Sequence, residues 1–370
     1  MRIGIFNHLI KFQTVPLLTS LVVSMGNDTA IDLFTVDDSI INMSNLRVFN
    51  FSKIIWNSLS PFVLLLKSLR FIMNEKYDYV AAVDPHDIIP AIVLKKIFKA
   101  KLIYICLEIF VKKDINNNYY RYYYYLQHAL MRYFDYIIIT DQGRQMLLSE
   151  NAPTFQNKTK WICLPNSTMG DGQLFRSQFL HQRLNICINK KILLLPGDIT
   201  NESMIHALCA EARKIDDTYV IVLHSRSKQK QEQLLRVIGE HKGIRVSIEP
   251  VPYDKLDQIY GSAHIGLVIY DVTQKGMMAS NVQCIGKSSG KLNNFLKLGV
   301  PVIMTDLPFF RELERKYDCG VCVNNIDEII RATELIERQY VTYSKNAETC
   351  FAEEMSFGKA FQEAGHLFTH

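Results

Sequence analysis

Residues 286–306 read "GKSSGKLNNFLKLGVPVIMTD", which begins with small and polar residues and continues into an apolar pattern. The beginning is close to the phosphate-binding P-loop, which has four residues between its first glycine and a Gly-Lys pair followed by Ser or Thr. Here only three residues separate Gly286 from Gly290. Leu292 also stands where the P-loop has its hydroxyl residue. The stretch is therefore not a P-loop, and its serines and lysine need another explanation.

The later part of the stretch predicts a helix and a strand. We expect the helix to begin near Ser288 or Ser289, because the apolar residues from Leu292 onward repeat at i, i+3 and i+4. Strand patterns at 265–270 and 301–305 flank this helix. A strand, a long loop, a helix and a second strand form the repeating unit of a parallel sheet covered by helices.

The same alternation extends over nearly the whole chain. Twelve short runs of β-branched and other apolar residues are candidate strands: 2–6, 30–36, 79–83, 101–106, 136–140, 160–164, 191–196, 219–224, 245–249, 265–270, 301–305 and 320–323. In the second half, helical patterns at 202–214, 229–240 and 326–338 separate the strands. Six strand–helix units in each half predict an α/β protein with two doubly wound domains. The alternative, a TIM barrel, needs only eight units and about 250 residues, which fits twelve candidates poorly.

The predicted domain boundaries follow from where the pattern weakens. The stretch 166–189 is the least regular and is the predicted connection between the domains. We therefore place an N-terminal domain at 1–168, a C-terminal domain at 185–340 and a closing helical segment at 341–370.

The composition is that of an ordinary globular protein. The 370 residues are 48% hydrophobic and 21% charged, and the formal net charge is +5. This charge suits an anionic ligand or a membrane surface without requiring either, and no dense run of Lys and Arg indicates nucleic acid. Eight scattered cysteines, mostly in apolar stretches, predict reduced thiols and a cytoplasmic location. The one C-x-x-C, from Cys319 to Cys322, lacks the further ligands of a zinc site, so we expect no metal.

Neither a secretory leader nor a membrane span is predicted. Met1 is followed directly by a strand pattern, without a cleavage site after an apolar core. The most apolar stretch, 54–73, is interrupted by Asn57, Pro61 and two basic residues, which predicts an amphipathic or buried helix.

The start of the predicted helix is suited to bind an anion. Ser288 and Ser289 are good N-cap residues, and Gly290 lets a ligand approach the first turn. The free amides and the positive end of the helix dipole would point outward at the carboxyl edge of the sheet. Lys291 lies in the same turn, where a cation costs stability unless an anion offsets it. We therefore predict a phosphate site; the alternative is a capped helix whose lysine is solvated.

The stretch 288–306 resembles the S-K-L-x-E-Y-x-x-x-G-x-P-V-I segment of GT-B glycosyltransferases, in particular relatives of family 4. Six other stretches are similar to segments of this family in the same order: "VDPHDIIPAIVLKKIFKAKLIYICLEIF" (83–110), "YFDYIIITDQGRQMLL" (133–148), "WICLPNS" (161–167), "LLLPGDI" (193–199), "VPYDKLDQIYGSAHIGLVIY" (251–270) and "EEMSFGKAFQEAGHLF" (353–368). The resemblance covers essentially the whole chain. It implies two Rossmann-like domains facing a cleft, with the last helix crossing back to the first domain.

The resemblance also implies a reaction. Relatives transfer a sugar from a nucleotide-sugar in the C-terminal domain to an acceptor in the N-terminal domain, and family 4 relatives retain the anomeric configuration. It therefore implies a hexosyltransferase-type enzyme of polysaccharide biosynthesis with a UDP- or GDP-linked co-substrate, no further cofactor, and a glycan or lipid-linked glycan acceptor. Helix amides and Lys291 would stabilise the diphosphate leaving group. The chain has no D-x-D, the metal-holding pair of the other main glycosyltransferase fold, so a metal-independent mechanism is expected.

The donor contacts that the resemblance implies lie mostly at predicted strand ends and in the helix start. They are Gly197, Asp198, Arg226, Tyr253, Asn281, Ser288, Ser289, Gly290, Lys291 and Asn294. Asn294 departs from the family, because it replaces a glutamate that binds the donor ribose and would form weaker hydrogen bonds. For Arg226 the alternative is a solvated turn residue, and for Tyr253 an ordinary packed tyrosine.

The N-terminal domain offers fewer matches to the family. Glu108 corresponds to the glutamate of the family's H-E motif, but Leu107 replaces the histidine. His86 and Asp87 are the remaining polar pair at a strand end, and the alternative for His86 is that it only caps a helix. The predicted catalytic residues are His86, Asp87, Glu108 and Lys291.

Two further features of this domain concern the acceptor. Asn7 and His8 follow the first predicted strand at the same edge and are predicted acceptor contacts. The stretch 116–134, "NNNYYRYYYYLQHALMRYF", is rich in tyrosine and contains Arg121, a composition that suits either ordinary packing or peripheral contact with the inner face of a membrane.

Three other functions remain alternatives. A nucleotide-sugar epimerase of the same fold would need no acceptor, and a non-catalytic GT-B subunit would explain the departures at Leu107 and Asn294. A generic dinucleotide-binding protein is disfavoured, because "GIFNHLI" stands after the first strand where G-x-G-x-x-G is expected.

Overall fold

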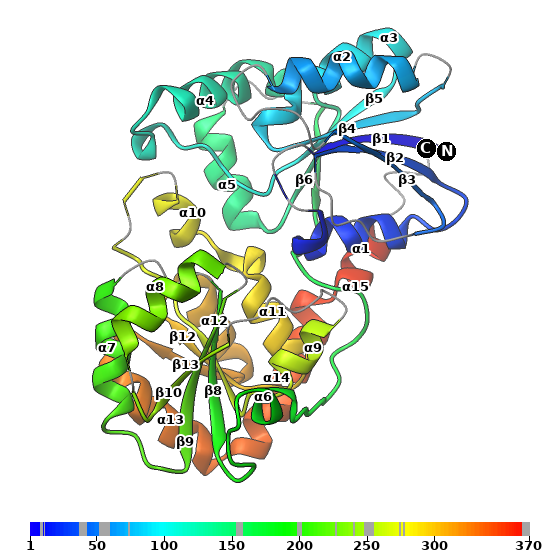
Figure 1. Cartoon of the computed structure of the whole chain (residues 1–370). Helices are drawn as coiled ribbons and strands as arrows, with labels where there is room; N and C mark the ends of the chain where they lie inside the picture. The colour runs from blue at the N-terminus through cyan, green and yellow to red at the C-terminus, as the bar shows by residue number, and fades with distance from the viewer. Residues whose placement is uncertain are drawn as a thin grey trace. The chain divides into compact units, whose positions relative to one another are not determined.

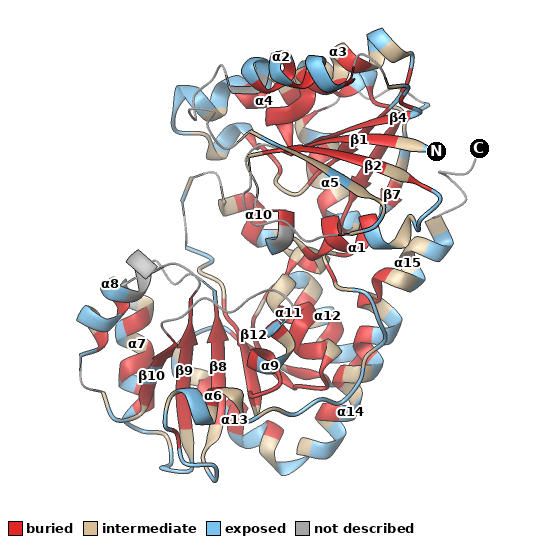
Figure 2. Cartoon of the chain, turned by 45° about the vertical axis from the view of Figure 1, so that its right-hand side comes forward, coloured by how far each residue is buried: buried red, intermediate tan, exposed pale blue. Residues whose placement is uncertain are grey.

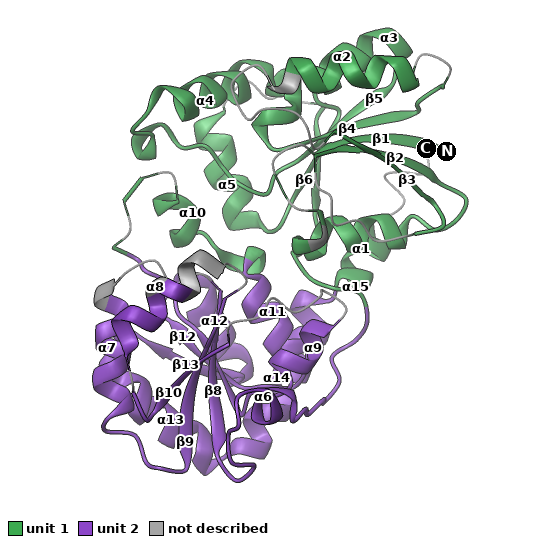
Figure 3. Ribbon diagram, viewed as in Figure 1, with its two compact units in different colours: residues 1–169, 273–288, 357–370 green, residues 170–272, 289–356 purple. Residues whose placement is uncertain are grey.

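The chain forms two compact units, each built on one parallel sheet (Figure 3). Unit 1 contains residues 1–169, 273–288 and 357–370, and unit 2 contains residues 170–272 and 289–356. The computed structural model describes residues 1–7, 10, 12–36, 43–51, 60–72, 75–152, 158–197, 202–225, 228–239, 241–247, 255–273, 275–276 and 278–364.

Unit 1 has a seven-stranded parallel sheet of order β3-β2-β1-β4-β5-β6-β7 (Figure 1). Its strands are β1 Arg2–Asn7, β2 Ala30–Thr35, β3 Leu46–Asn50, β4 Tyr79–Val83, β5 Lys101–Ile105, β6 Tyr136–Ile139 and β7 Lys160–Cys163. Its helices are α1 Pro16–Ser24, α2 Ser60–Ile72, α3 Ile88–Phe98, α4 Asn118–Leu130, α5 Gln142–Asn151, α10 Ala279–Gln283 and α15 Phe357–Ala364. The strand order reverses between β1 and β4, which is where doubly wound sheets bind ligands.

Apolar side chains cover both faces of this sheet. On one face, α2 and α3 pack through residues such as Leu64 and Leu94, and on the other α1 and α15 pack through Leu21 and Phe357. Burial on both faces is the reason that the strands are nearly continuous apolar runs.

Unit 2 has a six-stranded parallel sheet of order β10-β9-β8-β11-β12-β13. Its strands are β8 Lys191–Pro196, β9 Tyr219–His224, β10 Ile244–Ser247, β11 Ile265–Val268, β12 Val302–Thr305 and β13 Gly320–Val323. Its helices are α6 Phe179–Arg183, α7 Glu202–Ala212, α8 Lys228–Ile238, α9 Leu256–Tyr260, α11 Gly290–Lys297, α12 Pro308–Tyr317, α13 Ile329–Arg338 and α14 Tyr340–Cys350. The order reverses between β8 and β11.

Helix α11 packs very closely on the centre of this sheet. The ring of Phe295 lies over the backbone of β11 at Gly266, where a Cβ atom would meet the ring at 2.5 Å. Only glycine leaves room for this contact, which holds the start of α11 beside the carboxyl end of β11.

Each of the twelve predicted strands corresponds to an observed strand, within one or two residues, and β3 was not predicted. The unit division passes from unit 1 to unit 2 after Met169, inside the predicted connection 166–189. It also differs from the predicted ranges, because 273–288 belongs to unit 1 and α14 to unit 2. Of the stretch 54–73, the structure describes α2, and no helix among the described residues is long and apolar enough to cross a membrane.

Candidate functional site

The start of α11 is a capped helix end beside the carboxyl end of β11. Ser289 is the N-cap residue, and its Oγ accepts a hydrogen bond from the backbone N–H of Leu292 at 3.2 Å. The hydroxyl groups of Tyr270 and Ser289 are hydrogen-bonded at 2.7 Å, so the residues just after β11 hold the cap in place. Ser289 thus caps the helix as predicted, its donor contact stays a prediction, and the amides of Gly290 and Lys291 lie in the first turn.

Ser288 does not cap this helix. It closes a 3-10 turn at Gly286–Ser288 that belongs to unit 1. Its hydroxyl is hydrogen-bonded to the hydroxyl of Thr140 at 2.7 Å, and its carbonyl oxygen accepts from the side-chain amide of Asn166 at 3.1 Å. The prediction that both serines are N-cap residues is therefore wrong for Ser288. Its hydroxyl and carbonyl groups instead contact Thr140 and Asn166, which follow β6 and β7.

Lys291 is a partly buried cation at this helix start. Its Nζ donates to the carbonyl oxygen of Ile269 at 2.9 Å and lies 4.0 Å from the ring centroid of Tyr270. It forms no ion pair with any residue in the described part of the chain. Burial lowers the pKa of Lys291 to about 8, because desolvation disfavours the ammonium form. A cation held without a carboxylate is suited to receive an anion.

Gly197 lies at the other side of the strand reversal. It follows β8 with φ of 103°, a conformation that favours glycine, and its N–H donates to the carbonyl oxygen of His224 at 2.8 Å. Apart from its own chain neighbours, no atom of the described residues lies within 4 Å of the place where its Cβ would stand. Because β8 and β11 are neighbours in the sheet, Gly197 and the start of α11 flank the same reversal point.

The remaining predicted donor residues do not all lie at this reversal point. Asn294 lies on α11 and is 7% exposed. Asn281 is fully buried in unit 1, where its amide bonds both the N–H of Ile109 at 2.9 Å and the carbonyl oxygen of Ile109 at 2.8 Å. The donor contact predicted for Asn281 stays a prediction. Four predicted site residues lie outside the described residues: His8, Asp198, Arg226 and Tyr253.

In unit 1, Asp84 occupies the carboxyl end of β4 in a strained conformation. Its φ of 57° and ψ of 175° are a combination that is adopted almost only by glycine. Its Oδ1 atom accepts hydrogen bonds from the backbone N–H groups of Leu107 at 2.7 Å and Glu108 at 3.0 Å. Burial raises the pKa of Asp84 to about 8, although these hydrogen bonds oppose the shift. Such strain is typical of functional sites, and Asp84 was not among the residues predicted for the site.

Glu108 lies on the turn that Asp84 holds. Burial raises its pKa, and the nearby Arg144 guanidinium, 4.0 Å away, opposes this shift. Among the described residues, Glu108 Oε2 and Asn7 Oδ1 are buried atoms without a hydrogen-bond partner; Asn7 ends β1, and Glu108 follows β5 at the same carboxyl edge of the sheet. Buried polar atoms of this kind indicate a place for water or a polar ligand.

His86 and Asp87 lie in the 3-10 turn Pro85–Asp87 that follows β4. The His86 ring lies against the ring of Tyr123 with a centroid distance of 4.0 Å and also contacts Phe110. The side chain of Asp87 is buried and forms no capping hydrogen bond to α3. The tyrosine-rich helix α4 therefore builds part of the surroundings of His86, which the sequence did not indicate.

Arg144 is the second residue that the sequence analysis missed. It is fully buried on α5, and its guanidinium donates to the carbonyl oxygen of Leu107 at 2.5 Å and to Oδ1 of Asn281 at 3.1 Å. Asp141 caps α5 by accepting from the N–H of Arg144 at 2.9 Å, and it also accepts from the N–H of Lys287 at 3.0 Å. These contacts join the turn of Glu108 to the segment 273–288.

We expect Arg144→Met to lower the free energy of unfolding by about 3 kcal/mol. The change removes a buried guanidinium from the Leu107 carbonyl oxygen and from one acceptor atom of Asn281. Chemical unfolding measures the difference. The matched control is Arg132→Met, at an exposed position, which should change stability by less than about 0.5 kcal/mol. Equal stability of the two variants would contradict the role of Arg144.

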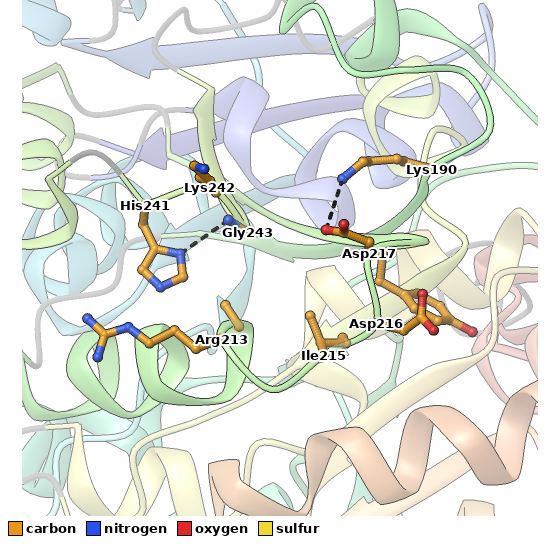
Figure 4. Close-up of a pocket in the computed structure, with 10 residues that line it drawn as sticks. Lys190, Arg213, Ile215, Asp216, Asp217, His241, Lys242 and Gly243 are labelled. Atoms are coloured by element: carbon orange, nitrogen blue, oxygen red, sulfur yellow. Dashed lines mark hydrogen bonds and ion pairs between the residues drawn. The ribbon is translucent and has the colours of Figure 1, made fainter.

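A pocket of about 400 Å³ opens at the opposite end of unit 2's sheet (Figure 4). Lys190 precedes β8, Tyr219 begins β9 and Gly243 precedes β10, so the pocket lies at the amino ends of these strands. Two pairs of its polar groups contact each other: Lys190 and Asp217 at 3.8 Å, and the N–H of Gly243, which donates to Nδ1 of His241 at 3.2 Å. Because doubly wound sheets bind ligands at the carboxyl ends, this pocket is not the candidate site. Among the residues that the structure describes, no cluster of His, Cys, Asp and Glu is suited to hold a metal ion.

Comparisons with known proteins identify the fold. No family model and no curated protein matches the sequence. Sucrose-phosphate synthase from Thermosynechococcus elongatus has a TM-score of 0.77 at 13% identity, over 100% of this chain and 98% of that chain. Anabaena HepE in complex with UDP-glucose has a TM-score of 0.68 at 13% identity, over 100% and 99%. WaaG, a glycosyltransferase involved in lipopolysaccharide biosynthesis, has a TM-score of 0.65 at 11% identity, over 100% of both chains.

An epimerase is also similar in structure. UDP-GlcNAc 2-epimerase from Neisseria meningitidis, bound to UDP-GlcNAc, has a TM-score of 0.58 at 13% identity, over 100% of both chains. At these identities the likeness concerns the fold, and the assignment to family 4 stays a prediction. Two parallel, doubly wound sheets that match these proteins over the whole chain show that the protein has the fold of the GT-B glycosyltransferases.

Proposed function

We propose that this protein transfers a sugar from a nucleotide-sugar donor to a glycan or lipid-linked glycan acceptor. The observation that carries the proposal is Lys291, a cation without a carboxylate partner in the described structure, in the first turn of a helix that begins at the strand reversal of unit 2. A helix start with a nearby cation is suited to the diphosphate of a nucleotide-sugar. The solved structures of similar proteins that hold UDP-glucose or UDP-GlcNAc support this choice of ligand.

The proposed chemistry places the charge stabilisation in unit 2. As the bond from the sugar to the diphosphate breaks, negative charge grows on the phosphate oxygens, and the Lys291 ammonium and the amides of Gly290 and Lys291 would stabilise it. This supply of positive charge supports a metal-independent reaction. Retention of the anomeric configuration is proposed from the resemblance to family 4.

Unit 1 supplies the proposed acceptor site. Glu108 and Asn7 present buried oxygen atoms without hydrogen-bond partners among the described residues, and such atoms are suited to hydroxyl groups of a sugar. His86 and Asp87 lie at the end of β4, the strand beside β5, which leads to Glu108. We propose that these four residues contact the acceptor or the transferred sugar.

A thermal-shift panel with UDP, GDP, CMP and ADP, with and without Mg²⁺, tests the donor site. A nucleotide at a hundred times its dissociation constant should stabilise the protein by about 2.7 kcal/mol. We expect UDP to give the largest shift, and Mg²⁺ to leave it unchanged. No shift with any of the four nucleotides would contradict the donor proposal.

The epimerase is the second candidate, because a UDP-GlcNAc 2-epimerase shares the fold over the full chain. The two activities differ in their need for an acceptor. Incubation of the protein with UDP-linked sugars alone, followed by analysis of the sugar nucleotides, separates them. Conversion of one sugar nucleotide into its epimer without an acceptor would favour the epimerase. Binding of UDP with neither conversion nor transfer would favour a non-catalytic subunit.

A further inference from the structure

Three helices of unit 1 lie in a row and cover one face of its sheet (Figures 1 and 2). Helices α2 and α3 pack on the sheet through the same apolar core, and α4 contacts α3. The outer surfaces of these helices and of the turns that follow α3 and α4 together form what we call the α2–α4 face. Figure 2 shows many exposed residues on the outer side of these helices.

The α2–α4 face is positively charged. The sequences of α2, α3 and α4 contain no Asp or Glu, although Asp and Glu make up 37 of the chain's 370 residues. Exposed basic residues on these helices and in the turns that follow α3 and α4 are Lys67, Arg70, Lys96, Lys99, Arg121 and Arg132. Two carboxylates near this face already have cationic partners. Asp135 is paired with Lys95, and Glu75 is paired with Arg2 and Arg47.

The same face exposes large apolar and aromatic side chains. Twenty such side chains are exposed in the described chain, and nine of them lie here: Phe62, Val63, Leu66, Phe71, Ile97, Tyr119, Tyr122, Tyr125 and Tyr133. On α2, Phe62 and Leu66 stand one turn apart, and Leu66 is 68% exposed. The basic Lys67 and Arg70 continue the same exposed stripe.

The pattern on α2 fits a lipid surface better than water. A helix with apolar and basic residues on one exposed side places the apolar groups at the acyl boundary and the cations among the headgroups. Tyrosines such as Tyr122 and Tyr125 suit the same boundary, because each has an apolar ring and a polar tip. A nucleic acid would neutralise the charges but would leave Phe62 and Leu66 exposed to water.

We propose that the α2–α4 face binds the surface of an anionic lipid bilayer. The charge is complementary to acidic headgroups, which attract Lys and Arg near a membrane surface. The apolar side chains provide the second contribution, by insertion into the headgroup region. This binding does not depend on the transfer reaction, and it would bring unit 1 to a lipid-linked acceptor.

Sedimentation of the full chain with vesicles tests the proposal. One set of vesicles is phosphatidylcholine alone, and in the other about one lipid in three is phosphatidylglycerol. We expect binding to the anionic vesicles that is at least about tenfold stronger than to the neutral ones and that weakens with added salt. Equal binding to both vesicles, or binding to neither, would overturn the proposal.

Two double variants separate the charge from the apolar contribution: Lys67→Glu with Arg70→Glu, and Phe62→Ser with Leu66→Ser. Each should weaken binding to anionic vesicles by about tenfold or more. The matched control changes exposed residues of α14 in unit 2, Val341→Ser with Lys345→Glu, and should bind as the wild type does. Equal weakening in the control would overturn the assignment to this face.

Two further measurements keep the outcome clear. All variants should retain the wild-type thermal shift with UDP, since Lys291 lies in unit 2, so loss of folding or of the donor site is detected separately. Light scattering at several protein concentrations tests self-association. A dimer that forms without lipid and is lost in Phe62→Ser with Leu66→Ser would replace the bilayer by a second copy of the chain as the occupant.

Discussion

Lys291→Ala is expected to weaken UDP binding by about 50-fold, because a charge-assisted hydrogen bond to phosphate is worth about 2.3 kcal/mol. At a UDP concentration one hundred times the wild-type dissociation constant, the stabilisation should fall from about 2.7 to about 0.6 kcal/mol. The variant should not lose stability without ligand, since the wild-type ammonium is held against a carbonyl oxygen and an aromatic ring and pairs with no carboxylate among the residues that the structure describes. Thermal unfolding with and without UDP measures both quantities.

The control is Lys297→Ala on the same helix. Lys297 is paired with Asp257 at 3.1 Å in the last turn, away from the capped end, and its loss should leave the UDP shift unchanged. An undiminished UDP shift in Lys291→Ala would remove Lys291 from the donor site. The helix would then be an ordinary capped helix.

The pH dependence gives a second test of Lys291. Its pKa in the folded protein, about 8, lies below the ordinary value of 10.5, so the unfolded state binds this proton more tightly. Below about pH 8 the buried ammonium therefore lowers the free energy of unfolding by its full amount. This loss disappears as the pH rises toward 10.5. UDP affinity should fall above about pH 8 as the charge is lost, and this fall should be absent in Lys291→Ala.

Most of the fold could be predicted because its strands are buried on both faces. Runs such as 136–140 and 191–196 contain few polar residues. In the helices between such runs, apolar residues recur with the period of a helix. Strand β3 was missed because Leu46–Asn50 is a half-exposed edge strand that contains Arg47. The place of segment 273–288 in unit 1 could not be predicted, since it depends on contacts such as that of Asn281 with Ile109, far away in the sequence.

The candidate site was predictable only where it depends on local sequence. Ser289 and Lys291 stand at a helix start, and both features are visible in a few residues. Asp84 and Arg144 depend on the folded environment instead. The strained backbone of Asp84 accompanies hydrogen bonds from Leu107 and Glu108, which are distant in the sequence, and Arg144 is fully buried although its neighbours in the sequence are polar.

Asp84→Ala is expected to lower the free energy of unfolding by about 2–3 kcal/mol and the transfer rate by about 100-fold, with UDP binding unchanged. The stability loss follows because the N–H groups of Leu107 and Glu108 lose their acceptor while the residue keeps a backbone conformation that alanine disfavours. The rate loss follows because the turn of Glu108 is no longer held in place, and it depends on the proposed transfer reaction. Chemical unfolding, UDP thermal shifts and initial rates of transfer measure the three quantities.

Two variants separate the carboxyl group from the backbone strain. Asp84→Gly removes the acceptor but relieves the strain, so it should be more stable than Asp84→Ala and equally slow. Asp84→Asn keeps an acceptor oxygen and should retain most of the rate near pH 7, where a carboxyl group with a pKa of about 8 is mainly protonated. Because this pKa lies above the unfolded value of 3.8, the native state binds the proton more tightly, and wild-type stability should fall as the pH rises from about 4 to about 8. The fall in stability should be smaller in Asp84→Asn, which still contains Glu108 and Arg144. If the wild type and Asp84→Asn gave the same dependence of stability on pH, Asp84 would be ionised throughout and would hold the turn as a carboxylate.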